Sequence, residues 1–263
     1  MPRGICELCQ IEKNLRDSHF MPKAIFKQLR MPTLKNPNPV LITPENTKTT
    51  SRHITDFVLC NDCEQRFSKL GESWVLANMA RTGDFPLQEA LISAGPMEWN
   101  QDFAIFSGAA IPAIDMDALT YFGMSIFWRA AAHEWKNDSG PMKGIDLDEY
   151  QEPIRRFLLG NDFPTNAVIL VAVWPKLEAP LLAYTPRKGE APGYEAFNFM
   201  IPGIEFRLLL GENVPAALKE RCSRTSLLRC IFSASTMLTE TRETFISLAS
   251  NSKVSENLKR DWL

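Results

Sequence analysis

The sequence predicts an α+β protein in which a small metal-binding module precedes a larger α+β domain. Four of the six cysteines form two C-x2-C pairs within the first 63 residues. The character of the chain changes near residue 84, and beyond it the predicted helices and strands are grouped rather than alternating, which favours α+β. We therefore expect a metal-binding module over residues 1–83 and an α+β domain of unassigned role over residues 84–263.

Bulk composition excludes several classes of protein. Of the 263 residues, 45% are hydrophobic and 23% are charged, as in ordinary globular proteins. The longest apolar run, residues 167–174, is far below the roughly 18 residues that span a bilayer. The N-terminus lacks the apolar stretch of a signal peptide. We expect a cytoplasmic protein without a membrane partner, in which cysteines serve as thiols or metal ligands.

Charge is distributed unevenly along the chain. Residues 1–70 contain 11 Lys/Arg and 7 Asp/Glu, whereas residues 71–263 contain 18 and 24. The basic excess therefore lies beside the cysteine pairs, which weakly favours a module that faces nucleic acid. A pI near 6.0 for the whole chain argues against strong non-specific DNA binding.

The cysteine pairs are the most specific signal, and they comprise Cys6, Cys9, Cys60 and Cys63. One C-x2-C pair could equally be a redox motif, but two pairs supply the four thiolates of a closed structural zinc site. A knuckle, two strands and a helix whose first turn supplies the last ligands form a treble clef. We interpret Cys222 and Cys230 as ordinary buried thiols.

Local patterns place the remaining elements of the module. Residues 31–50 contain four prolines and are predicted to form a loop. Residues 54–60 are predicted to form a strand, and residues 63–79 a helix. The spacing of Phe67, Leu70 and Trp74 predicts one buried stripe on that helix.

In the second part, the sequence predicts helices first and strands afterwards. Residues 84–115 contain three prolines and are predicted to be irregular. Residues 119–136 are apolar around most of a helical circumference and predict a central helix. A second helix is predicted over residues 147–159, closed by Gly160. Strands are predicted over residues 167–174, 181–185, 197–201 and 205–210, and helices over residues 215–224 and 227–238.

His19 and Pro22 follow the first cysteine pair as H-x-x-P, before a long insertion and the second pair. This order resembles the HNH endonucleases with a ββα-metal core, and CELC, SHFMPK, CNDCE and SIFWRAAAHEW are similar to a bacterial HNH-like group. The resemblance covers roughly residues 4–80. It implies a metal-dependent nuclease with a structural zinc, acting on nucleic acid, DNA more than RNA. It further implies that His19 is the general base and that Mg²⁺ or Mn²⁺ lies at the reacting phosphate.

The sequence departs from the HNH pattern at the expected ligands of this second metal ion. The family usually has Asp or Glu directly before the base, where this chain has Ser18. The family's terminal helix usually supplies Asn or His, whereas this chain offers Glu64 and Glu72, either of which could bind Mg²⁺ instead. His19 would otherwise be a structural histidine or a contact to nucleic acid.

Several other polar residues could have either a functional or a structural role. His53 either approaches the same cleft as His19 or is a surface residue. Arg129 interrupts an apolar face and must find a partner, either a carboxylate from another element or a phosphate. His133, four residues later, is interpreted as a satisfied core or interface histidine. Lys23, Lys27 and Arg30 recur at helical spacing and form either a phosphate-binding stripe or a solvated face.

Two alternatives to the nuclease hypothesis remain. The module could bind nucleic acid or protein through its zinc site without cleaving anything. The larger domain could also carry an unrelated activity that no short motif betrays. Under the nuclease hypothesis itself, the larger domain would position nucleic acid, restrain the nuclease, or bind a protein partner or a second copy of the chain.

Overall fold

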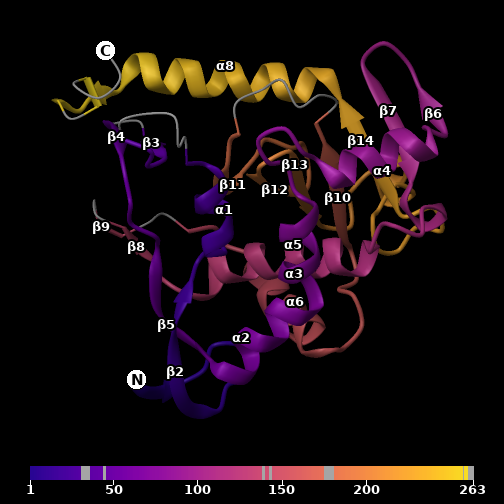
Figure 1. The fold of residues 1–263 in the computed structure, drawn as a ribbon. Coiled ribbons are helices and arrows are strands. Elements are labelled where there is room, and N and C mark those ends of the chain that lie inside the picture. The colour runs from indigo at the N-terminus through magenta and orange to yellow at the C-terminus, as the bar shows by residue number, and fades with distance from the viewer. Residues whose placement is uncertain are drawn as a thin grey trace.

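The structure is a computed structural model, and it describes residues 1–30, 36–43, 46–137, 140–141, 144–174, 181–256 and 258–259. A three-stranded sheet near the N-terminus and a seven-stranded mixed sheet in the second part frame the described chain. Helix α5 (Met116–Ala132) contacts elements of both parts (Figure 1). This arrangement confirms the predicted α+β class.

The N-terminal sheet carries the cysteine pairs. Its order is β1 (Arg3–Ile5), β2 (Glu12–His19) and β5 (Thr55–Cys60), all antiparallel. A register shift in the β2–β5 pairing follows Leu15, and His19 is paired with Thr55. Helix α2 (Asn61–Phe67) follows β5 directly. The module therefore has the strand–strand–helix order predicted for a treble clef.

The helix after Cys60 is long, but its buried face differs from the prediction. α2 continues through a π-helical segment, η1 (Ser68–Glu72), into α3 (Ser73–Asn78). Phe67 is buried as expected, whereas Leu70 is 44% exposed. The π-helical turn has more residues than an α-turn and moves the buried face onto Gly71 and Val75. The predicted stripe through Leu70 is therefore wrong.

The insertion between the cysteine pairs contains more regular structure than predicted. Helix α1 (Lys23–Gln28) follows Pro22, and strands β3 (Val40–Ile42) and β4 (Asn46–Thr49) form a hairpin. β15 (Lys253–Val254), far along the chain, pairs in parallel with β4. The prediction of a loop over residues 31–50 is wrong for these strands, and residues 31–35 and 44–45 lie outside the described chain.

The large sheet has the order β11-β12-β13-β10-β14-β7-β6 and is antiparallel except between β10 and β14. The four predicted strand runs correspond to β10–β13, although β11 begins three residues later than its predicted run. The strands are β6 (Glu98–Trp99), β7 (Phe103–Ser107), β10 (Ala167–Val173), β11 (Tyr184–Lys188), β12 (Glu195–Ile201), β13 (Ile204–Leu210) and β14 (Cys230–Ala234).

Two segments of the second part differ from the prediction. Residues 84–115, expected to be irregular, contain α4 (Pro86–Ala94) with Pro86 in its first turn, where proline is well tolerated, followed by β6 and β7. Residues 227–238, expected to be helical, contain β14 and only the start of α8 (Ser235–Asn251). Figure 1 shows α8 running from β14 towards β3 and β4.

The remaining short elements complete the described chain. The predicted second helix is present as η3 and α6, and Gly160 closes it with φ of 109°. The elements are η2 (Gly108–Ala110), β8 (Lys136–Asn137), β9 (Gly140–Pro141), η3 (Asp148–Tyr150), α6 (Gln151–Leu159) and α7 (Ala216–Lys219).

Helix α5 is the central element of the core, as predicted. Most of its residues are buried. The Phe67 ring of α2 packs edge-on against Trp128, and the Phe122 ring packs against Phe199 and Phe206 of the large sheet. A Cβ added to Gly71 would lie 2.9 Å from the backbone nitrogen of Phe122, so glycine permits this close helix approach.

The two predicted parts share one continuous cluster of buried side chains. The boundary at residues 83–84 stays a prediction. Within the described chain, no helix combines the length and apolarity that a membrane crossing requires.

Candidate metal centre

Four cysteines from three elements meet at one end of the N-terminal sheet. Cys6 and Cys9 lie on the turn between β1 and β2, Cys60 ends β5, and Cys63 lies in the first turn of α2. Their sulfur atoms all lie within 4.8 Å of one another. Cys9 is partly exposed and the other three are buried. The structure therefore assembles all four predicted ligands into one group.

The geometry of this group suits a tetrahedral zinc ion. The Sγ atoms of Cys9 and Cys60 are 4.0 Å apart, too far for a disulfide. Four Zn–S bonds of about 2.3 Å in a tetrahedron place the sulfurs about 3.8 Å apart. The backbone N–H of Cys60 donates to Cys6 Sγ at 3.3 Å, as expected around a metal-bound thiolate.

Electrostatics also favours a cation among the sulfurs. A hydrogen bond with the Cys63 thiol lowers the pKa of Cys6 to about 4, and the same contact raises the pKa of Cys63. Burial raises the pKa of Cys9. Among Cys6, Cys9 and Cys63, negative charge on one thiol therefore disfavours ionisation of its neighbours, and a divalent cation would offset this repulsion.

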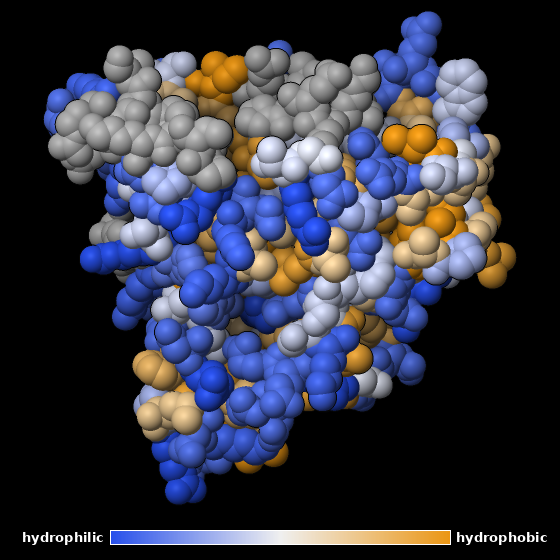
Figure 2. Space-filling view, in the orientation of Figure 1, coloured by the Kyte–Doolittle hydropathy of each residue, from blue (hydrophilic) through white to orange (hydrophobic). Residues whose placement is uncertain are grey.

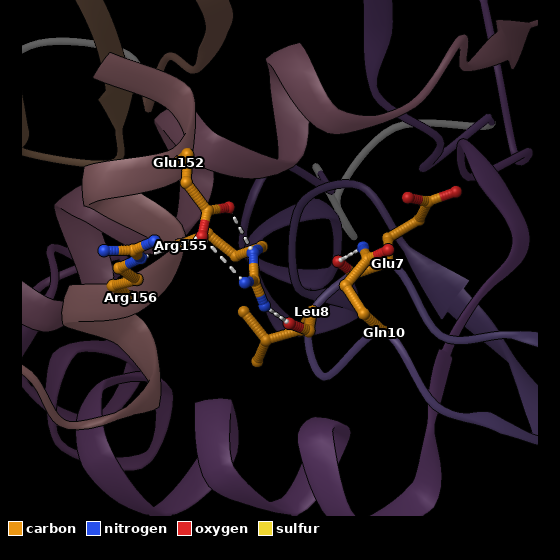
Figure 3. A network of polar contacts seen from close by, with 6 residues as sticks. All are labelled: Glu7, Leu8, Gln10, Glu152, Arg155 and Arg156. Carbon is orange, nitrogen blue, oxygen red and sulfur yellow. Dashed lines mark hydrogen bonds and ion pairs between the residues drawn. The ribbon is translucent and has the colours of Figure 1, made fainter. Parts of the chain in front are cut away.

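An arginine from the second part of the chain holds the first cysteine turn. Arg155 of α6 donates from Nη1 to the carbonyl oxygen of Leu8 at 2.5 Å (Figure 3). Its Nε donates to Glu152 at 2.6 Å, and Arg156 donates to the same carboxylate at 2.9 Å. These contacts, that from Arg155 above all, lower the pKa of Glu152 to about 2. Arg155 therefore fixes the metal-binding turn to α6.

His19 ends β2 and lies beside His53. The two ring centroids are 5.5 Å apart, and the His53 ring stacks on Phe26 of α1 at 4.9 Å. Burial, with the nearby charge of His19 and Lys23, lowers the pKa of His53. The structure thus supports the interpretation that His53 approaches His19.

Of the side chains considered at the second metal site, those of Ser18 and Glu72 already make other contacts. Glu72 accepts from Arg129 at 2.6 Å, and both side chains are largely buried. The hydroxyl of Ser18 is buried and accepts from the backbone N–H of Leu59. Glu64 has a buried Oε1 atom without a hydrogen-bond partner. Of the described His, Cys, Asp and Glu side chains, the four cysteines form the one group of three or more that could hold a metal ion.

His133, Cys222 and Cys230 lie outside the cysteine group and have surroundings typical of residues that serve the fold. His133 forms a 2.9 Å contact with Asp56, which lowers the pKa of that carboxyl, and its ring packs edge-on against Trp135. This agrees with a satisfied histidine. Cys222 and Cys230 are fully buried, as expected of ordinary thiols.

A concave basic surface lies beside His53. Its volume is about 600 Å³. We call it the basic groove and define it by Lys23, Phe26, Lys27, Arg30, Arg52 and His53. No carboxylate is among the described residues that line it. Figure 2 shows that hydrophilic side chains dominate the face where α1 lies in Figure 1.

Sequence reasoning found the basic stripe but missed the groove's other components. Lys23, Lys27 and Arg30 have no ion-pair partner among the described residues. Phe26 and Arg52 were not singled out, although Phe26 lies between two lysines in KAIFKQ, a basic and aromatic pattern suited to nucleic acid.

Comparison with protein-family models, with curated proteins and with solved structures finds no match for this chain. Function is therefore inferred from the site itself.

Proposed function

We propose that Cys6, Cys9, Cys60 and Cys63 hold one structural zinc ion, and that the module around it is an HNH-like nuclease. Its reaction would be hydrolysis of phosphodiester bonds in nucleic acid, DNA more than RNA, with His19 as the general base. The observation that carries this proposal is the position of His19, whose ring centroid lies 5.5 Å from that of His53, one of the residues that line the basic groove.

In this proposal His19 has one chemical role, which is to accept a proton from the attacking water. A neutral imidazole near pH 7 can accept a proton from water as the water oxygen attacks phosphorus. The cations of the basic groove would bind the substrate phosphates and offset their charge. The carbonyl oxygen of His19 accepts from the buried Arg129 at 3.3 Å, which helps to fix the end of β2.

The described side chains do not form a set of protein ligands for Mg²⁺ or Mn²⁺ beside His19. The earlier alternative that Glu72 binds Mg²⁺ is disfavoured, because this carboxylate already pairs with Arg129. We therefore assign no step of the reaction to such an ion. Whether cleavage requires a divalent cation is a direct outcome of the experiment below.

The same observation favours a second candidate function. A zinc-stapled module with a basic groove, but without a second metal site, would bind nucleic acid without cutting it. In that case His19 would contact the phosphate backbone or serve only the fold.

A nicking assay distinguishes the two candidates. Supercoiled plasmid and circular single-stranded DNA would each be incubated with zinc-loaded protein, with and without added Mg²⁺ or Mn²⁺. The proposal predicts nicking by the wild type and its loss in His19→Ala, with unchanged zinc content. Lys69→Gln is the matched control, because Lys69 is exposed and lies outside the basic groove. It should nick at the wild-type rate.

Each other result has a definite meaning. Equal nicking by His19→Ala would remove His19 from the mechanism. Absence of nicking, combined with salt-sensitive binding that Lys27→Gln weakens and Lys69→Gln does not, would establish the binding function instead.

A further inference from the structure

The basic groove presents its cations inside a concavity rather than on a projecting element. Lys23 and Lys27 lie on α1, and Arg30 lies two residues after its end. The imidazole of His53 belongs to the segment just before β5. Proteins usually contact duplex DNA with a helix or a ribbon that enters a groove of the duplex. Here the relation is reversed, because the protein supplies the hollow and the ligand must enter it.

The size of the hollow limits what can enter. A volume of about 600 Å³ is typical of a small-molecule site, and it could hold only a short length of one polymer strand. A single strand can thread such a groove, whereas the rigid duplex cannot be accommodated within it. Lys23 and Lys27 are separated by about 6 Å along the axis of α1, so the side of the groove that α1 forms carries two cations in a row.

The groove also contains an aromatic surface. Phe26 and His53 are stacked, with an interplanar angle of 19°, and both rings are only partly buried. Base–aromatic stacking beside a positive groove is the usual way in which proteins hold single strands without reading a sequence. Neither feature alone would indicate a base, but together they offer sites for a phosphate and for its neighbouring base.

We propose that the basic groove binds a single-stranded segment of nucleic acid, with phosphates on Lys23, Lys27 and Arg30 and a base against Phe26 and His53. This inference deepens the proposed function and rests on it. Because the His53 ring is 5.5 Å from the His19 ring, a base held in the groove brings the adjoining phosphodiester towards His19.

Binding of labelled oligonucleotides tests this preference. Fluorescence anisotropy would compare a short mixed-sequence single strand with the duplex of the same sequence, using the zinc-loaded full chain without added Mg²⁺ or Mn²⁺. We expect the single strand to bind about tenfold more tightly. Phe26→Leu keeps an apolar side chain but removes the ring, and it should lower single-strand affinity about tenfold while leaving duplex affinity unchanged. Phe26→Tyr should restore the single-strand preference.

A second set of variants tests the phosphate contacts. Lys27→Gln should weaken both ligands and reduce the slope of log affinity against log salt by about one. Lys69→Gln should change neither affinity nor slope. Zinc content and thermal melting of each variant would show that the fold is intact.

Three results would overturn the proposal. They are duplex affinity equal to that of the single strand, a single-strand affinity unaffected by Phe26→Leu in a folded protein, and competition by a mononucleotide as effective as that by the oligonucleotide. The last result would assign the groove to a free nucleotide. Failure to cleave both the plasmid and the circular single-stranded DNA would refute the proposed nuclease activity yet leave these binding results intact, so the two failures are distinguishable.

Discussion

The buried ion pair between Arg129 and Glu72 links α5 to the π-helical segment next to α2. Arg129 Nη2 lies 2.6 Å from Glu72 Oε1, with side-chain exposures of 2% and 16%. The guanidinium also lies 4.5 Å from the centre of the Phe67 ring and donates to the carbonyl oxygen of His19. One side chain therefore joins the central helix, the metal-bearing helix and the strand that carries the proposed base.

We expect Arg129→Met to destabilise the fold strongly. Methionine preserves much of the apolar stem but leaves the Glu72 carboxylate with no partner in a largely buried place. Removing one member of a buried pair costs about 3–5 kcal/mol. The residual exposure of Glu72 lets water reach it, so we expect the lower end, about 3 kcal/mol. Replacing both residues in Arg129→Met/Glu72→Met should recover most of this, to within about 1 kcal/mol of wild type.

Urea unfolding of the zinc-loaded protein, followed by circular dichroism, measures these differences. Lys188→Met is the control, because the Lys188–Glu195 pair is exposed and screened by solvent, so its loss should change stability little. The reasoning is refuted if Arg129→Met costs no more than this control. It is also refuted if the double variant is as unstable as the sum of the single variants, which would mean that the charges do not interact.

Three further predictions follow from other contacts. Gly71→Ala should cost about 1–3 kcal/mol in urea unfolding, because its new methyl would meet the backbone of α5, whereas Gly189→Ala, whose Cβ has ordinary contacts, should stay within about 0.5 kcal/mol of wild type. Arg155→Met removes the bond to the Leu8 carbonyl, so zinc should pass to a colorimetric chelator faster than from wild type, and an unchanged rate would disprove the role given to Arg155. Burial raises the pKa of Tyr121 from 10.0 to about 12, so above pH 10.0 the unfolded chain releases this proton before the folded chain does, and stability falls as pH rises through this window. Thermal melting of Tyr121→Phe should fall less steeply there, and an identical decline would contradict this account.

Short-range spacing predicted the parts of the site that depend on neighbouring residues. Two C-x2-C pairs, the second at a helix start, were sufficient to predict the group formed by Cys6, Cys9, Cys60 and Cys63. The apolar runs of the large sheet were equally clear, since β10, β12 and β13 are rich in Val, Ile, Leu and Phe. The apolar residues around most of the circumference of α5 predicted that this helix is central.

The errors occurred where geometry departs from ideal periodicity. A period of 3.6 residues placed Leu70 in the core, but the π-helical segment shifts the buried face to Gly71. Within 227–238, apolar residues occur both in β14 and at the start of α8. Hydrophobic periodicity therefore could not distinguish the strand from the helix that follows it.

Long-range pairings were beyond the reach of spacing. The sequence indicated that Arg129 needs a partner, but Glu72 is 57 residues away and was considered as a metal ligand instead. The basic groove likewise exists only because the insertion between the cysteine pairs returns to α1, which brings His53 against Phe26.

Metal analysis of the purified protein tests the central claim most directly. The account predicts about one zinc ion per chain in the wild type, since four thiolates complete a structural site. Cys222→Ser, which alters a buried thiol outside the site, should keep this zinc, and Cys60→Ser should lose it along with much of the fold's stability. A wild-type protein that is folded and free of zinc, or a Cys60→Ser variant that keeps its metal, would contradict the account.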